Sequence, residues 1–170
     1  MYQEFFTQFA NSLISLSNQL DKAEAYAQAR KFDVQNLLQS RLAPDQFPLG
    51  KQVQIACDNA KLAAARLSGQ DAPKHDDTET TIDEFKARIQ HTVDYLRSFK
   101  EEDFAEAADK KIILPFMPTF YFDGNDYLYH FVVPNFFFHV TTAYSILRHN
   151  GVELGKQDFM HGLPLKPVEA

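Results

Sequence analysis

The chain has 170 residues, 45% of them hydrophobic, which is enough for one domain with its own core, and we predict a single domain over residues 1–170. Its net charge of −6, with Lys and Arg scattered, argues against nucleic-acid binding, because phosphate recognition needs a basic stripe. No apolar run is long enough to span a bilayer, and the single cysteine, Cys57, cannot form an intrachain disulfide. We therefore expect a cytoplasmic protein without membrane contact.

The N-terminal segment is predicted to be helical. Its large apolar residues follow the spacing of one helical face over about residues 1–20: Phe5, Phe6, Phe9, Leu13, Leu16 and Leu20. Asp21 stands three residues before Glu24, which is the pattern of a capping box and predicts a second, short helix to about Arg30.

Two further helices are expected before residue 70. Asp33 is predicted to cap a short one from Val34 to Arg41, and the proline-containing run LAPDQFPLG then connects it to a long one, Leu49–Leu67. A narrow stripe of small and apolar residues favours close packing of this long helix: Val53, Cys57, Ala60, Ala64 and Leu67. Cys57 lies on this stripe of small residues and is interpreted as a buried thiol rather than a nucleophile.

The polar, acidic segment GQDAPKHDDTET is interpreted as a surface loop and not as a site. It leads into a capping box, Thr81 with Glu84, which predicts a third long helix to about Phe99. Beyond a charged turn, residues 111–115 and 119–122 are β-prone and flank prolines, and Asp123-Gly124 closes them. We predict a small β-hairpin here.

The last helix is predicted from about Asn125 or Asp126 to Asn150-Gly151, which is a good helix stop. Pro134 lies inside it. A proline removes one backbone hydrogen bond and crowds the preceding turn, so we expect a kink or a break at that position.

One histidine, His139, falls inside the apolar arc of this last helix, among side chains such as Phe136, Val140 and Ala143. Asn135 and Thr142 lie on the same flank of the helix. Two interpretations stay open: a core histidine satisfied by a neighbouring hydroxyl or carbonyl, or a metal ligand or general base.

The aromatic content is unusual, with 16 Phe, 7 Tyr and no Trp, and it is densest at residues 116–122 and 127–138. Phe138 lies on the opposite face of the last helix from the apolar arc. Either the hairpin buries Phe138 or it contacts a second subunit, and we predict a homodimer.

The segments FFFHVTTAYSILRHNGVELGK and PLGKQVQIACDNAK resemble the DinB-like superfamily, and most closely an uncharacterised domain-of-unknown-function branch of it. The resemblance extends over nearly the whole chain. It implies an all-α fold, a DinB-like four-helix bundle, with additional short helices and a small β-hairpin before the last helix.

The resemblance also implies a metal position. Better-studied members carry H-x3-H on the last helix and a third histidine on the second long helix, which together bind a divalent metal. Matching Leu147, Arg148 and Gly151 places His139 on the second histidine of the pair, with Asn135 in place of the first and Gln54 nearest to the third. Amide oxygens are weak zinc ligands, so no bound cofactor is expected, although a weakly bound divalent metal stays an alternative.

Two functions follow from the residues and the resemblance. The first is a small-molecule-binding or interaction bundle that works without metal and keeps a degenerate metal site. The alternative is a metal-dependent thiol transferase or hydrolase in which His139 acts as base, or as one ligand of a site completed by Asn135 and Gln54. Whether the protein is an enzyme stays open, and neither reading names a substrate.

Overall fold

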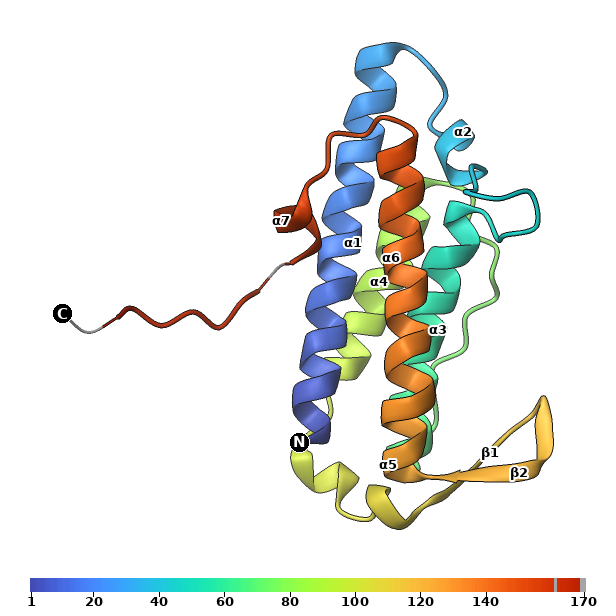
Figure 1. Cartoon of the computed structure of the whole chain (residues 1–170), viewed down its shortest axis with the longest axis vertical. Coiled ribbons are helices and arrows are strands. Elements are labelled where there is room, and N and C mark those ends of the chain that lie inside the picture. Colours follow the sequence, from blue (N-terminus) through green and yellow to red (C-terminus); the bar gives the residue numbers. More distant parts are fainter. Residues whose placement is uncertain (161, 169–170) are drawn as a thin grey trace.

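The computed structural model describes residues 1–160 and 162–168 and consists mainly of a four-helix bundle (Figure 1). Its long helices are α1 (Tyr2–Arg30), α3 (Leu49–Ser68), α4 (Ile82–Arg97) and α6 (Val133–His149). Helix α1 packs against α4 and α6, and α3 packs against the same two helices. The all-α bundle that the sequence predicts is therefore confirmed.

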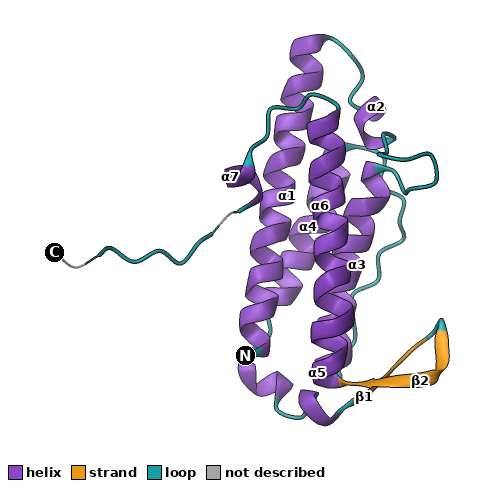
Figure 2. Cartoon of the chain, in the orientation of Figure 1, coloured by secondary structure: helices purple, strands orange, loops and turns teal. Residues whose placement is uncertain are grey.

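Short elements connect the long helices (Figure 2). Strands β1 (Lys111–Leu114) and β2 (Met117–Asp123) form the predicted antiparallel hairpin, in which Ile112 pairs with Phe122. The other short elements are α2 (Gln35–Leu38), the 3₁₀ turns η1 (Glu101–Phe104) and η2 (Ala107–Asp109), α5 (Gly124–Asp126), the π-helical turn η3 (Tyr127–Val132) and α7 (Lys156–Phe159).

Local signals in the sequence explain where α3 and α4 begin and end. Thr81 Oγ1 accepts the Glu84 N–H at 3.3 Å, and Glu84 accepts the Thr81 N–H at 2.9 Å, so the predicted capping box opens α4. Helix α3 ends at Gly69, whose φ of 85° lies in the left-handed region that glycine adopts without strain.

The predicted break near Asp21 is wrong, because α1 continues without interruption to Arg30. The apolar stripe does not stop at Leu20: Ala23 and Ala27 extend it, and both are buried. The side chain of Asp21 points outward and pairs with Lys86 of α4, so it does not cap a new helix.

The last helix also differs from the prediction in its first turns. The π-helical turn η3 occupies residues 127–132, and Pro134 is then accommodated in the first turn of α6, where its missing N–H is tolerated. The irregularity thus lies at residues 127–132, before the proline, and not at Pro134 itself, which belongs to the α-helical segment α6.

The core lies between the four long helices. Phe9 of α1 meets Phe136 of α6 with ring centroids 4.3 Å apart, and Phe6 stacks on Phe104 at 5.0 Å. Cys57 is fully buried, which confirms its interpretation as a buried thiol, and burial raises the pKa of this thiol to about 12 although Arg88 and Lys61 lie nearby and act to lower it. In the part of the chain that the structure describes, no helix combines the length and the apolar character needed to cross a membrane.

Candidate functional site

The imidazole of His139 is buried on α6 and is held by one side chain from α3. Its Nδ1 lies 2.7 Å from Oε1 of Gln52, and Gln52 Nε2 donates to the carbonyl of Phe47 at 2.9 Å. Because the amide nitrogen faces a carbonyl, the amide oxygen must face the imidazole and can only accept. His139 therefore carries its proton on Nδ1 and presents a lone pair at Nε2.

Burial also keeps this imidazole neutral. Desolvation lowers the pKa of His139 below its usual 6.5, since the charged form loses more hydration than the neutral form. At pH 7 the side chain is an oriented, neutral base. Both interpretations that the sequence left open apply in part. The hydrogen bond at Nδ1 is that of a satisfied core histidine, whereas the lone pair at Nε2 could still accept a proton or bind a ligand.

The side chain that orients His139 is neither Asn135 nor Gln54, the two residues that the resemblance placed with it in a metal site. Gln54 is two positions after Gln52, which places it about 200° further around α3, and its Nε2 donates to Glu79 at 2.9 Å. Asn135 is half-buried on α6, and within the described residues its side chain forms no hydrogen bond. His139, Asn135 and Gln54 therefore do not share one hydrogen-bonded site.

A helical wheel of α3 contains the signal that would have identified Gln52. Leu49, Ala56 and Ala60 stand three residues before and four and eight residues after it, and all three are buried. Gln52 thus lies on an apolar flank that faces α6, and a buried amide on such a flank requires a polar partner.

The donor atoms around His139 do not fit a tight zinc site. The side chain that contacts its imidazole is an amide, and zinc prefers imidazole, thiolate or carboxylate. Over residues 1–160 and 162–168, no three His, Cys, Asp or Glu side chains gather closely enough to hold a metal ion.

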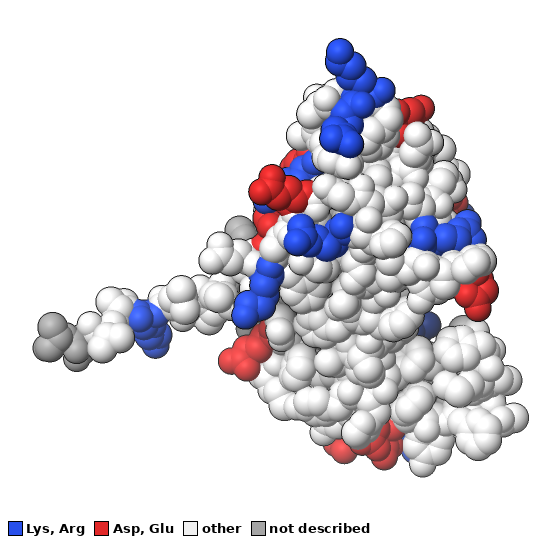
Figure 3. Space-filling view, turned by 45° about the horizontal axis from the view of Figure 1, so that its top comes forward, with Lys and Arg blue, Asp and Glu red and all other residues white. Residues whose placement is uncertain are grey.

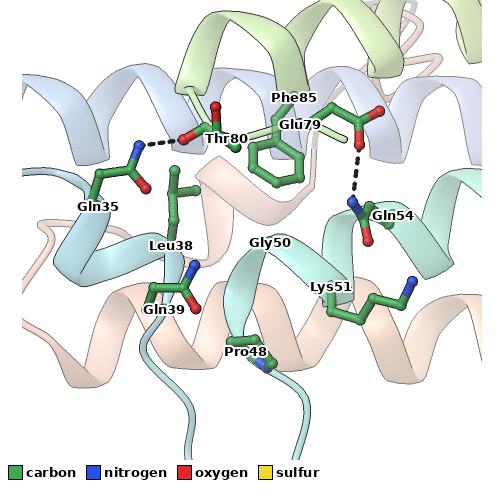
Figure 4. A pocket seen from close by; sticks show the side chains of 10 residues that line it. All are labelled: Gln35, Leu38, Gln39, Pro48, Gly50, Lys51, Gln54, Glu79, Thr80 and Phe85. Carbon is green, nitrogen blue, oxygen red and sulfur yellow. Dashed lines mark hydrogen bonds between the residues drawn. The ribbon is translucent and has the colours of Figure 1, made fainter. Parts of the chain in front are cut away.

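Gln54 instead lines a small pocket at the end of the bundle where α2, the start of α3 and the start of α4 meet (Figure 4). The cavity measures about 190 Å³. Three glutamines line it, Gln35 of α2, Gln39 directly after α2 and Gln54 of α3, and Gln35 donates to the carbonyl of Thr80 across one side. The lining consists of Gln35, Leu38, Gln39, Pro48, Gly50, Lys51, Gln54, Glu79, Thr80 and Phe85.

One wall of this pocket is held by a buried arginine of α4. Arg88 donates to Glu79 at 2.9 Å, to Asp77 at 2.7 Å and to Asp58 at 2.8 Å, and its side chain is only 1% exposed. Burial alone would raise the pKa of Glu79, but hydrogen bonds from Arg88 and Gln54 hold that pKa below its usual value. Glu79 is therefore a fixed, charged wall at neutral pH.

The same network ties down the segment between α3 and α4. Lys61 Nζ lies 2.9 Å from Asp58 and 3.2 Å from Nδ1 of His75, and burial, with Lys61 and Arg88 nearby, lowers the pKa of His75. The sequence presented this segment as a solvated loop, yet Asp77 and Glu79 reach a buried cation. The available signal was Arg88 itself, which occupies a core-facing position of its helix.

Comparison with known proteins agrees with this architecture. Residues 1–160 match the family model described as a domain of unknown function, DUF1993. A crystal structure of a DinB family member protein from Shewanella denitrificans is 48% identical, covers 98% of both chains and superposes with a TM-score of 0.93. No protein of curated function matches the chain. The chain therefore belongs to the DUF1993 family of DinB-like four-helix bundles.

Proposed function

We propose that the protein binds a small, uncharged polar molecule in the pocket beside Gln54, without a metal. The observation that carries the proposal is the pocket itself: it is lined by three glutamine side chains and the Thr80 segment on one part and by Leu38 and Phe85 on another. Such a mixture of a few polar groups with apolar walls is typical of small-molecule sites.

The size and charge of the pocket define the ligand. A cavity of about 190 Å³ has room for roughly six water-sized groups at ~30 Å³ each. Its two charged side chains are already paired, Glu79 with Arg88 and Lys51 with Asp77 at 2.8 Å. Glutamine amides both donate and accept, so a ligand with a primary amide or hydroxyl next to an apolar group fits best.

Benzamide and acetamide are suitable probes, tested by saturation-transfer NMR. We expect benzamide to bind better than acetamide, because its ring adds contact with Phe85 and Leu38. Gln54→Leu should abolish the signal, whereas Gln90→Leu, an exposed glutamine on α4, should keep it. Absence of binding by both probes, or equal binding to the Gln54 variant, contradicts the proposal.

A second function is supported by the Nδ1–H tautomer of His139. An imidazole that is neutral at pH 7, oriented by Gln52 and free at Nε2 within the described residues has the properties of a general base. In this version of the thiol transferase or hydrolase alternative, Nε2 of His139 takes up a proton from the substrate and no metal is required. Its support is this one residue, so it ranks below the binding function.

The metal content of the purified protein separates the metal-dependent enzyme from the two metal-free functions, small-molecule binding and base catalysis by His139. Protein purified without an affinity tag is analysed for Zn, Ni, Mn and Fe, together with His139→Ala. We expect no stoichiometric metal in either, since the donors near His139 are amides. A stoichiometric metal that is lost in His139→Ala would establish the metal-dependent alternative.

Self-association, which the sequence suggested from Phe138, is also proposed. The hairpin does not bury this ring, and 54% of its surface is exposed. A large apolar side chain left bare on a helix supports a contact with another subunit.

A further inference from the structure

The β1–β2 hairpin projects from the bundle as an arm, here defined as residues 111–123 (Figure 1). Its base is anchored, because Ile112 and Leu114 are buried and Phe122 packs near Tyr127 and Phe131. Its outer part is bare and apolar, with exposed fractions of 58% for Ile113, 68% for Phe116, 71% for Phe120 and 53% for Tyr121.

Both sides of the arm carry these bare side chains. Phe120 is two residues before Phe122, so strand alternation places it on the side that faces the bundle. Tyr121 is on the opposite side, where Lys111 Nζ lies 4.7 Å from its ring centre. An isolated two-stranded sheet is marginally stable in water. This one also has two unpaired edges and apolar side chains on both sides, so contact with another surface would stabilise it.

The π-helical turn η3 and then helix α6 continue this surface. The ring of Phe116, at the turn of the arm, lies 6.1 Å from the ring of Phe131. Phe138 follows Phe131 by seven residues, which is two helical turns along the same face. Phe138 therefore extends the same face beyond the contact between Phe116 and Phe131. The arm of the same chain does not cover Phe138, which stays exposed.

Apart from Lys111 and Asp123 at the base of the arm, this surface lacks charge. Residues 112–122 and 127–147 contain no Asp, Glu, Lys or Arg, and Figure 3 shows charged side chains gathered around a broad uncharged area. Two copies of a chain with a net charge of −6 repel each other except where such an uncharged face allows them to meet.

We propose that the arm and the adjoining face of α6 around Phe138 form a homodimer interface, in which each copy covers the arm of the other. This inference rests on the proposed self-association and assigns its surface. At ~200 Å² for a large side chain, the five exposed residues amount to roughly 600 Å² per copy, and hence about 1,200 Å² in total, the lower limit of stable interfaces.

A second copy fits this surface better than a membrane does. An arm that inserts into an anionic lipid surface is normally accompanied by several Lys or Arg residues, but Lys111 is the only Lys or Arg between residues 111 and 147. The acidic net charge would also repel such a surface.

The test is the mass of the full chain by sedimentation equilibrium from 1 to 100 μM. We expect a dimer of twice the 19.5 kDa of one chain, weakened at least tenfold by Phe120→Glu and by Phe138→Glu. The matched control is Phe47→Glu, since Phe47 is 55% exposed and lies on the loop before α3, outside the interface. Circular dichroism melts of all variants establish that they fold.

Three results would overturn the assignment: a monomer at all concentrations, a dimer that resists both arm and helix variants, or a dimer that Phe47→Glu weakens equally. A monomer removes self-association itself, whereas a resistant dimer removes only this interface. A separate experiment measures co-sedimentation of the protein with vesicles that contain 30% phosphatidylserine. Vesicle binding that Phe120→Glu abolishes would favour a lipid surface instead of a second copy.

Discussion

The Oε1 atom of Gln52 accepts a hydrogen bond from Nδ1 of His139 at 2.7 Å and joins the start of α3 to the middle of the bundle's last helix. The carbonyl of Phe47 sets the orientation of the amide, and the amide sets the tautomer of the imidazole. The sequence indicated a single histidine, and the structure shows three hydrogen-bonded residues in which Nε2 of that histidine has no partner among the residues that the structure describes.

Replacing Gln52 by Glu should raise the pKa of His139. A carboxylate that accepts from Nδ1–H stabilises the charged imidazolium, and we expect an increase of about 1 unit or more. The His139 Cε1–H resonance, assigned by its absence in His139→Gln, reports this pKa in an NMR titration. An unchanged value in Gln52→Glu would show that the two side chains are not paired in solution.

The stability of the protein should fall as the pH drops below 6.5. Burial lowers the folded-state pKa of His139 and of His75 below 6.5, so the unfolded chain takes up protons first as the solution is acidified. Each histidine then contributes a loss of at most ~1.4 kcal/mol per pH unit, down to its folded pKa. Above pH 6.5 their contribution to the pH dependence fades within about one pH unit, because the unfolded histidines then lose their protons as well.

Urea denaturation between pH 5 and 8 measures this slope. His139→Gln, which cannot titrate, should flatten it, and His91→Gln, an exposed histidine on α4, should leave it unchanged. Equal slopes for the wild type and His139→Gln would contradict the assigned burial effect.

Arg88 should be one of the most sensitive polar positions in the molecule. Arg88→Leu leaves Asp58, Asp77 and Glu79 without their shared cation, and we expect a loss of about 3 kcal/mol in the free energy of unfolding. Hydrogen exchange in residues 70–80 should accelerate, because this segment loses its attachment.

The control for Arg88 is on the same helix. Arg97 is exposed, and Arg97→Leu should change stability by less than about 0.5 kcal/mol. If Arg88→Leu were as mild as Arg97→Leu, the buried network would not hold the segment between α3 and α4.

Gly124, at the junction of the arm and α5, should not tolerate a side chain. A Cβ there would lie 1.7 Å from the backbone oxygen of Ala107, so the backbone must move, and we expect Gly124→Ala to cost about 3 kcal/mol. At Gly155 the atom nearest to an added Cβ is 4.0 Å away, and Gly155→Ala should lower the free energy of unfolding by less than about 1 kcal/mol. Thermal unfolding of both variants measures the two losses.

Much of the fold could be predicted from local patterns. The capping box of Thr81 and Glu84, the stop at Gly69 and the hairpin before Gly124 all depend on residues close together in sequence. The helix break predicted at Asp21 is wrong, because the same capping pattern also occurs inside helices. Here the packing of Ala23 and Ala27 in the core makes the helix continue.

The candidate site was predicted only in part. Periodicity showed that His139 faces the core, and its burial confirms this. The resemblance placed Gln54 with His139 as a metal ligand, but the side chain of α3 that contacts the imidazole is Gln52, and a shift of two residues turns a side chain to the far side of a helix. The pairing of Gln52 with His139 spans 87 positions and is set by how α3 packs on α6.

The sequence by itself determined the four helices, the arm and the inward histidine, because periodicity, caps and turns act over a few residues. Only the tertiary structure decided the tautomer of His139, the pocket beside Gln54 and the burial of Arg88 among three carboxylates. Each of these depends on the rotation of one helix against another, and hydrogen-bond geometry is sensitive to that rotation at the scale of a single residue.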